Sequence, residues 1–147
     1  MLCIDKIFVD TGYMHKAIET ALRRTPNPAV KPSHGIGVTA KKTPLNQWPK
    51  RAGRRYGDYW FEDKPLNRGF RTVTLDVNYW KCAVHDALNM EVGDSGGLTL
   101  WGKNPERHRM FADHCNAETV QWVSAMYQCH EWASKPDQDN HLFDCMQ

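Results

Sequence analysis

The order of β-like and helix-like runs constrains the fold of this chain more than any other feature. Residues 1–10 predict a strand that ends at Asp10, and the apolar spacing over 13–25 predicts a helix that prolines end. Residues 58–63 and 70–77 predict a hairpin whose second strand ends at Asp76, and 78–90 predict another helix. Such alternation favours an α/β fold with a central mixed sheet flanked by helices, since the hairpin makes an all-parallel sheet unlikely.

The remaining segments give weaker patterns. We expect at most a short strand around Val30, an exposed loop over 41–57, and one strand or two joined by a turn over 119–134. The other expectations are an N-cap at Asn78, a short strand at 98–102, a helix start at Asn104-Pro105, and a last helix from about Asp139 or Asn140.

Length and cysteine usage limit the class of protein. The 147 residues suffice for one domain, 1–147, with a hydrophobic core. Five cysteines without a CxxC pair, and no signal peptide or long apolar run, favour a reducing, cytoplasmic compartment and no membrane span. The net charge of +2 decides little.

Three familiar kinds of site are not supported. The segment Gly93–Gly97, GDSGG, is spelled like a serine-protease nucleophile motif, but the chain is too short for two β-barrels and no histidine segment of that family precedes it. We interpret it as a glycine-rich turn. No GxxxxGK[ST] or GxGxxG motif is present. The His114-Cys115 and Cys129-His130 pairs are adjacent residues that point in different directions, which argues against a zinc site.

Three aspartates occupy positions suited to metal chemistry. Asp10 and Asp76 end predicted strands, and Asp144 lies on the predicted last helix. Converging carboxylates bind hard cations such as Mg²⁺ or Mn²⁺, and two such ions about 3.5–4 Å apart activate water for phosphodiester cleavage. Each aspartate taken alone has the alternative role of a helix cap or turn residue.

A basic, aromatic segment predicts contact with nucleic acid. Between Lys41 and Arg71 there are nine Lys or Arg residues against three acids, and interleaved with them are the aromatic residues Trp48, Tyr56, Tyr59, Trp60 and Phe61. Positive charge with aromatic rings suits a phosphate backbone and unstacked bases. An ordinary solvated loop is the alternative. The best candidates for DNA contact are Lys41, Lys42, Arg54 and Arg55.

Several motifs, in order along the whole chain, resemble the nuclease domain of phage terminase large subunits of the lambda GpA type. They are IFVDTGY, VTLDVNYWK, the segment from LTLWG to HRMFADHCNAE, and KPDQDNHLFDC. The resemblance implies an RNase H-like fold that cuts concatemeric double-stranded DNA with Mg²⁺ or Mn²⁺. It also implies three partners in the bacterial host cytoplasm: the terminase ATPase domain, the small subunit and the portal.

The resemblance also assigns roles to residues. Asp10, Asp76 and Asp144 would be the metal-binding acids, with His141 as a further ligand or proton carrier and Asp139 and His141 as rivals to Asp144. Lys81 would face the scissile phosphate or pair with an acid. The family's ATPase motor is not found before the domain, and the last helix is expected to be truncated. The alternatives are a non-catalytic DNA- or portal-binding module and a different RNase H-like enzyme, such as a resolvase or an RNA-cutting nuclease.

Overall fold

The computed structural model describes residues 4–24, 27–38, 43–64, 70–124 and 129–146. Within the strands at 123–124 and 129–130 it describes the backbone alone. The chain divides into two compact units, Met1–Asp76 and Val77–Gln147, and each is described by itself. The expectation of one domain over 1–147 stays a prediction.

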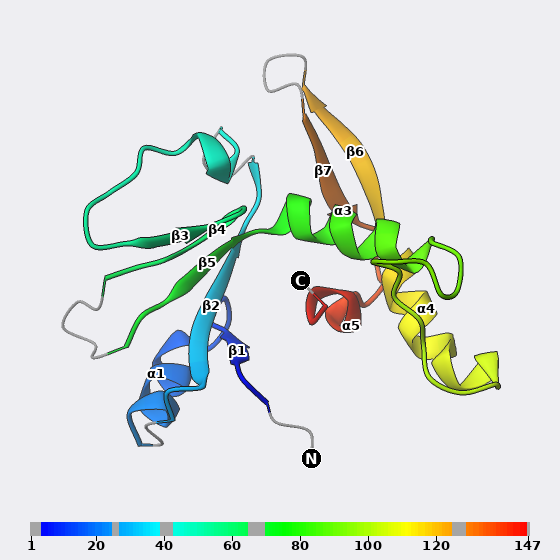
Figure 1. Ribbon diagram of the computed structural model, residues 1–147, viewed down its shortest axis with the longest axis horizontal. Coiled ribbons are helices and arrows are strands. Elements are labelled where there is room, and N and C mark those ends of the chain that lie inside the picture. Colours follow the sequence, from blue (N-terminus) through cyan, green and yellow to red (C-terminus); the bar gives the residue numbers. More distant parts are fainter. Residues whose placement is uncertain (1–3, 25–26, 39–42, 65–69, 125–128, 147) are drawn as a thin grey trace. The chain divides into compact units, whose positions relative to one another are not determined.

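The first unit is built on a five-stranded mixed sheet, which confirms the expected α/β class (Figure 1). In spatial order its strands are β1 (Ile7–Asp10), β2 (Val30–Ile36), β5 (Val73–Asp76), β4 (Trp60–Glu62) and β3 (Arg55–Gly57). The first three are parallel, and β4 runs antiparallel to both of its neighbours. Strands β1 and β5 therefore run in the same direction, and Asp10 and Asp76 lie at the same end of the sheet, where the parallel strands have their carboxyl ends.

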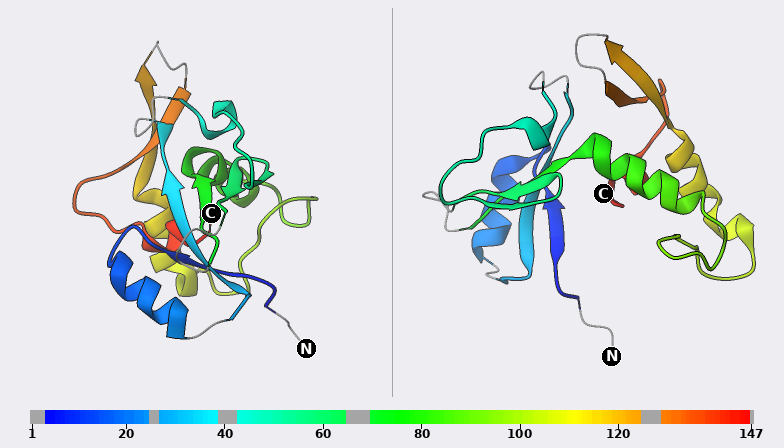
Figure 2. Two further views of the ribbon diagram at one scale, coloured as in Figure 1. Left: turned by 90° about the vertical axis from the view of Figure 1, so that its left-hand side faces the viewer. Right: turned by 45° about the horizontal axis from the view of Figure 1, so that its top comes forward.

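Helix α1 (His15–Arg24) connects β1 to β2, as a crossover between parallel strands requires (Figure 2). Strand β2 is seven residues long, whereas the sequence predicts only a short strand around Val30. It contains Pro32, which is fully buried. The ladder with β5 begins only at Ser33, so the missing N–H of Pro32 interrupts no hydrogen bond on that side.

The predicted hairpin of residues 58–63 and 70–77 is confirmed as the pair β4 and β5. The loop expected over 41–57 is more ordered than predicted. It includes a 3₁₀ turn, η1 (Leu45–Gln47), with Leu45 buried, and strand β3. The order arises because Tyr56 of β3 pairs with Phe61 of β4, which is 3 % exposed. Packing against a buried aromatic residue fixes a segment whose local pattern is irregular.

At the turn between β3 and β4, the backbone of Gly57 and the indole ring of Trp60 lie unusually close together. The second residue of the turn, Tyr59, has a φ of 56°, a left-handed conformation uncommon for a large side chain. The carbonyl of Tyr59 accepts the N–H of Asp76 at 2.9 Å, which ties the turn to the end of β5. A Cβ atom at Gly57 would lie 2.0 Å from Nε1 of Trp60. Glycine is therefore required at position 57 for Trp60 to pack where it does.

The second unit combines helices with a two-stranded antiparallel sheet. Along the chain its elements are α3 (Val77–Leu88), η2 (Pro105–His108), α4 (Arg109–Asn116), β6 (Glu118–Ser124), β7 (Cys129–Ser134) and α5 (His141–Asp144). Figure 1 shows β6 and β7 as one hairpin, the two-strand form of the prediction for 119–134. The side chain of Asn104 accepts the N–H of Glu106, which confirms the predicted helix start.

Two expectations for this unit are wrong. Asn78 lies inside α3, which begins at Val77, and its Oδ1 accepts the N–H of Trp132 at 3.3 Å instead of capping the helix. Residues 98–102 form no strand. Their leucines are largely exposed, so the apolar alternation there has no described sheet to join.

We predict that Gly57→Ala lowers the free energy of unfolding by about 1–3 kcal/mol, the usual cost of overpacking. The added methyl group must displace the Trp60 indole. Urea denaturation measures the change. The matched control is Gly57→Ala in a Trp60→Ala background, where the cost should largely vanish because the colliding ring is gone. An equal cost in both backgrounds would contradict the explanation.

Candidate functional site

Asp10 presents an accessible carboxylate at the end of β1. The residue is exposed, and its Oδ1 accepts the N–H of Gly12 at 3.0 Å. This contact is an Asx turn. It gives Asp10 the role of a turn residue, which the sequence offers as the alternative to metal binding. The turn uses one carboxylate oxygen in this way and leaves the residue in contact with solvent.

Asp76 occupies a different environment at the end of β5. It is 4 % exposed, and its Oδ2 accepts the N–H of Leu45 at 3.3 Å. Its own N–H donates to Tyr59, as described above. Asp76 therefore connects β5 to η1 and to the β3–β4 turn. A buried carboxylate needs such donors, because an uncompensated one is costly.

The register of the sheet sets the distance between these two acids. Asp10 lies opposite Ser33 of β2, and Asp76 lies opposite Ile36, three residues further along the same strand. With β2 between them, their backbone positions are separated by roughly 10 Å across the sheet and roughly 10 Å along it. Two aspartate side chains and one ion do not bridge that diagonal, on the order of 14 Å.

In the second unit, Asp144 belongs to a buried charged cluster that we call the Lys81 cluster: Lys81, Glu118, Asn140 and Asp144. The Nζ of Lys81 lies 2.6 and 2.5 Å from the two carboxylate oxygens of Glu118 and 2.8 Å from Oδ1 of Asp144. Lys81 and Glu118 are each 6 % exposed, whereas the side chain of Asp144 is 43 % exposed. The cluster thus has one solvent-facing carboxylate and one buried one.

Further contacts hold Glu118 in the cluster. Its Oε1 accepts hydrogen bonds from Ser134 Oγ at 3.3 Å and from Asn140 Nδ2. The Phe143 ring lies 5.6 Å from Lys81 Nζ. Sequence reasoning missed Glu118, although it lies at the end of the HRMFADHCNAE motif. The available signal was a glutamate that directly follows a helix and begins a strand.

The expected three-acid site is split between the units. Asp10 and Asp76 belong to the first unit, where they lie too far apart to share one ion, and Asp144 belongs to the second, so the approach of Asp144 to either of them stays a prediction. Within the described residues, no group of three or more His, Cys, Asp or Glu side chains is arranged to hold a metal ion. The Lys81 cluster does have two carboxylates directed at one cation position. Their hard oxygens fit Mg²⁺ or Mn²⁺, provided that the Lys81 ammonium leaves.

The two rivals of Asp144 lie on the surface beside it in the chain. His141 Nε2 is 3.6 Å from Asp139 Oδ1, and their side chains are 78 % and 76 % exposed. The His114 ring lies 6.3 Å from the His141 ring, and His114 Nδ1 accepts the N–H of Leu142 at 3.2 Å. His114 thus positions the start of α5.

Of the predicted DNA contacts in the first unit, Arg54 and Arg55 are described. Lys41 and Lys42 lie outside the described residues. Arg54 is held internally: its Nε is 2.6 Å from Asp63 Oδ1, and its guanidinium lies 4.1 Å from the Phe61 ring centroid. Arg55 is more available, with a side chain 70 % exposed and a 3.4 Å contact to Glu62. Lys81, the fifth candidate, is in the buried cluster of the second unit.

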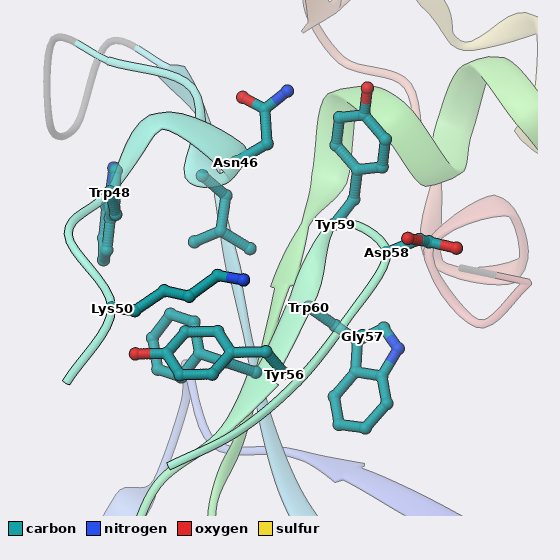
Figure 3. A pocket seen from close by; sticks show the side chains of 10 residues that line it. Asn46, Trp48, Lys50, Tyr56, Gly57, Asp58, Tyr59 and Trp60 are labelled. Carbon is teal, nitrogen blue, oxygen red and sulfur yellow. The ribbon is translucent and has the colours of Figure 1, made fainter. Parts of the chain in front are cut away.

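A hollow of about 360 Å³ lies beside these arginines in the first unit (Figure 3). We call it the aromatic hollow. Sequence reasoning grouped its aromatic residues with the basic segment but did not single out Lys50, whose side chain extends into the hollow in Figure 3. The hollow is lined by Leu45, Asn46, Trp48, Lys50, Tyr56, Gly57, Asp58, Tyr59, Trp60 and Phe61.

Burial raises the pKa of the Cys115 thiol above its ordinary value. Zinc binds the thiolate, so this environment opposes metal binding at that residue. The side chains of the second pair considered as zinc ligands, Cys129 and His130, lie outside the described ones.

Comparisons with known proteins found no match for this chain among family models, curated proteins or solved structures. None of the helices in the described residues has the length and apolar character to cross a membrane.

We predict that Lys81→Met lowers the free energy of unfolding by about 3–5 kcal/mol, because Glu118 is left as a buried, uncompensated charge. The double variant Lys81→Met/Glu118→Met should recover most of this loss. Thermal and urea denaturation measure both changes. Lys103→Met, at an exposed position, is the control. A cost for Lys81→Met no larger than for the control would contradict the buried ion pair.

Proposed function

We propose that this chain is a metal-dependent endonuclease domain with an RNase H-like fold, which cuts concatemeric double-stranded viral DNA during phage genome packaging. The observation that carries the proposal is the Lys81 cluster, in which the late motif residue Asp144 and the neighbouring Glu118 share one cation position. Lysine 81 and both acids lie within the motifs that resemble the terminase nuclease. The ATPase domain, small subunit and portal are proposed partners on the same resemblance.

The roles follow from exposure and contacts. Asp144 and Glu118 would hold the divalent ion, and Asp10 would present an accessible carboxylate to the same site once the domain is assembled. The ion, when bound, would activate a water molecule and stabilise the leaving oxygen. Lys81, when displaced from the carboxylates, would supply a positive charge for the scissile phosphate. Asp76 would act as a positioning residue, since it is buried and holds η1 and the β3–β4 turn.

One observation favours a second function, a DNA- or portal-binding module without catalysis. The Lys81 ammonium already occupies the cation position between the two carboxylates that would bind the ion. A domain in which that ion pair is permanent binds DNA through its basic residues, with a steep dependence on salt and none on metal.

We predict that Asp144→Asn and Asp10→Asn each lower plasmid nicking at least about 100-fold, because removal of even an indirect metal partner typically costs about 10- to 100-fold. Nicking of supercoiled plasmid is measured with Mn²⁺, with Mg²⁺ and with EDTA. Asp86→Asn, an exposed carboxylate of α3, is the matched control and should retain activity.

The outcomes separate the alternatives. Nicking of equal rate in wild type and Asp144→Asn would rule out the assigned site. No nicking by any of these proteins, with DNA still retained in a gel shift in EDTA, would favour the binding module. Preferential cleavage of branched DNA or of an RNA–DNA hybrid over duplex would point to a different RNase H-like enzyme.

A further inference from the structure

We propose that the aromatic hollow of the first unit binds an unpaired nucleotide of a DNA single strand, with the base against the aromatic rings and the phosphate at Lys50. The inference rests on the proposed function only for the choice of DNA as the polymer. The choice of an unpaired nucleotide comes from the shape, rigidity and charge of the hollow.

Three rings form a floor and two walls. The floor is Phe61, which is 3 % exposed. The ring centroids of Trp48 and Tyr56 each lie 6.0 Å from the Phe61 centroid, with interplanar angles of 44° and 47°. Both wall residues are only partly buried, so their rings are available for contact. Aromatic faces arranged in this way suit the flat face of a nucleobase.

Hydrogen bonds fix both walls. Trp48 donates its Nε1–H to the carbonyl of Thr43 at 3.1 Å. The hydroxyl of Tyr56 accepts the N–H of Arg51 at 2.6 Å. On the floor, the Arg54 guanidinium contacts the Phe61 ring and is held by Asp63. A hollow whose walls are fixed before binding loses less side-chain entropy when a ligand enters.

The charge of the surrounding segment selects an anionic ligand. Residues 41–57 contain six Lys or Arg residues and no Asp or Glu. Lys50 is exposed, its Nζ lies 5.9 Å from the centroid of the Tyr56 ring, and no carboxylate of the described residues is within 4.0 Å of it. A quaternary or methylated ammonium, the other common ligand of aromatic sites, would be repelled.

The size of the aromatic hollow and the need for an accessible base face exclude double-stranded DNA as its ligand. The volume of about 360 Å³ is near the lower end of small-molecule sites and has room for a single nucleotide. In a duplex both faces of each base are stacked on neighbours, so ring faces become available only where the strand is unpaired. Asp58 and Asn46 are exposed at the rim and offer hydrogen bonds to the edge of the base.

Fluorescence anisotropy tests the proposal, with labelled oligothymidylate and a labelled duplex of equal length, both in EDTA so that no cleavage occurs. The wild type should bind the single strand more tightly than the duplex. Trp48→Leu should weaken single-strand binding about 5- to 150-fold, the range for loss of one stacked base, and leave duplex binding within about twofold. Far-UV circular dichroism checks that the variant folds.

Lys50 is exposed, so Lys50→Glu should leave the protein folded, and it tests the same site through charge. The substitution should weaken binding of the single strand more than binding of the duplex. The matched control is Lys16→Glu on α1, also an exposed lysine of the first unit, which should change both affinities equally. Equal losses for the two DNAs with Trp48→Leu or Lys50→Glu, or no loss with either, would overturn the proposal. So would tighter binding of a proline-rich peptide than of oligothymidylate, because that ligand also docks on aromatic grooves.

Failure of this proposal is distinguishable from failure of the proposed nuclease function. Metal-dependent nicking with unchanged single-strand binding in Trp48→Leu would overturn the nucleotide site alone. Selective single-strand binding without nicking in any metal would support the site and reject the nuclease.

Discussion

An ammonium group held between two carboxylates is the interaction on which the second unit depends. Lys81 comes from α3, Glu118 begins β6 and Asp144 ends α5, so one cation joins three elements that are distant in sequence. Apolar burial alone would fix them poorly, since only a few side chains of this unit, such as Phe143, are fully buried. Electrostatic pairing is more demanding in geometry than apolar contact, because a buried charge must meet its partner at hydrogen-bond distance. Because two carboxylates are already directed at one cation position, the Lys81 cluster is a candidate site for another cation.

In the first unit, the aromatic side chain of Phe61 joins separate segments in a comparable way. Phe61 lies under Trp48, Tyr56 and Arg54, and these contacts order a segment that has little regular structure of its own. The two rings that complete the packing are also the ones left partly accessible. These packing contacts explain why the segment holds a defined shape, and the proposed nucleotide site would use the same residues.

The sequence predicted best what local patterns determine. The strands that end at Asp10 and Asp76 have apolar periodicity and clear turn residues, and the structure has both. The three residues of β3 were missed because they form a strand only through pairing with β4. Glu118 was missed for a similar reason: its burial comes from the ion pair with Lys81, which lies 37 positions away, and its place between a helix and a strand is only a weak local signal. Whether Asp10 or Asp76 meets Asp144 depends on the arrangement of the two units, which no local pattern encodes.

Strand β1 has a consequence for handling the protein. It is the first strand in the order of the sheet, with β2 as its neighbour, and its Ile7 and Phe8 are 40 % and 50 % exposed. A sheet edge with apolar side chains is a template on which another chain can add a strand. We therefore expect concentrated samples to self-associate through this edge, and a low protein concentration should reduce that association during purification and crystallisation.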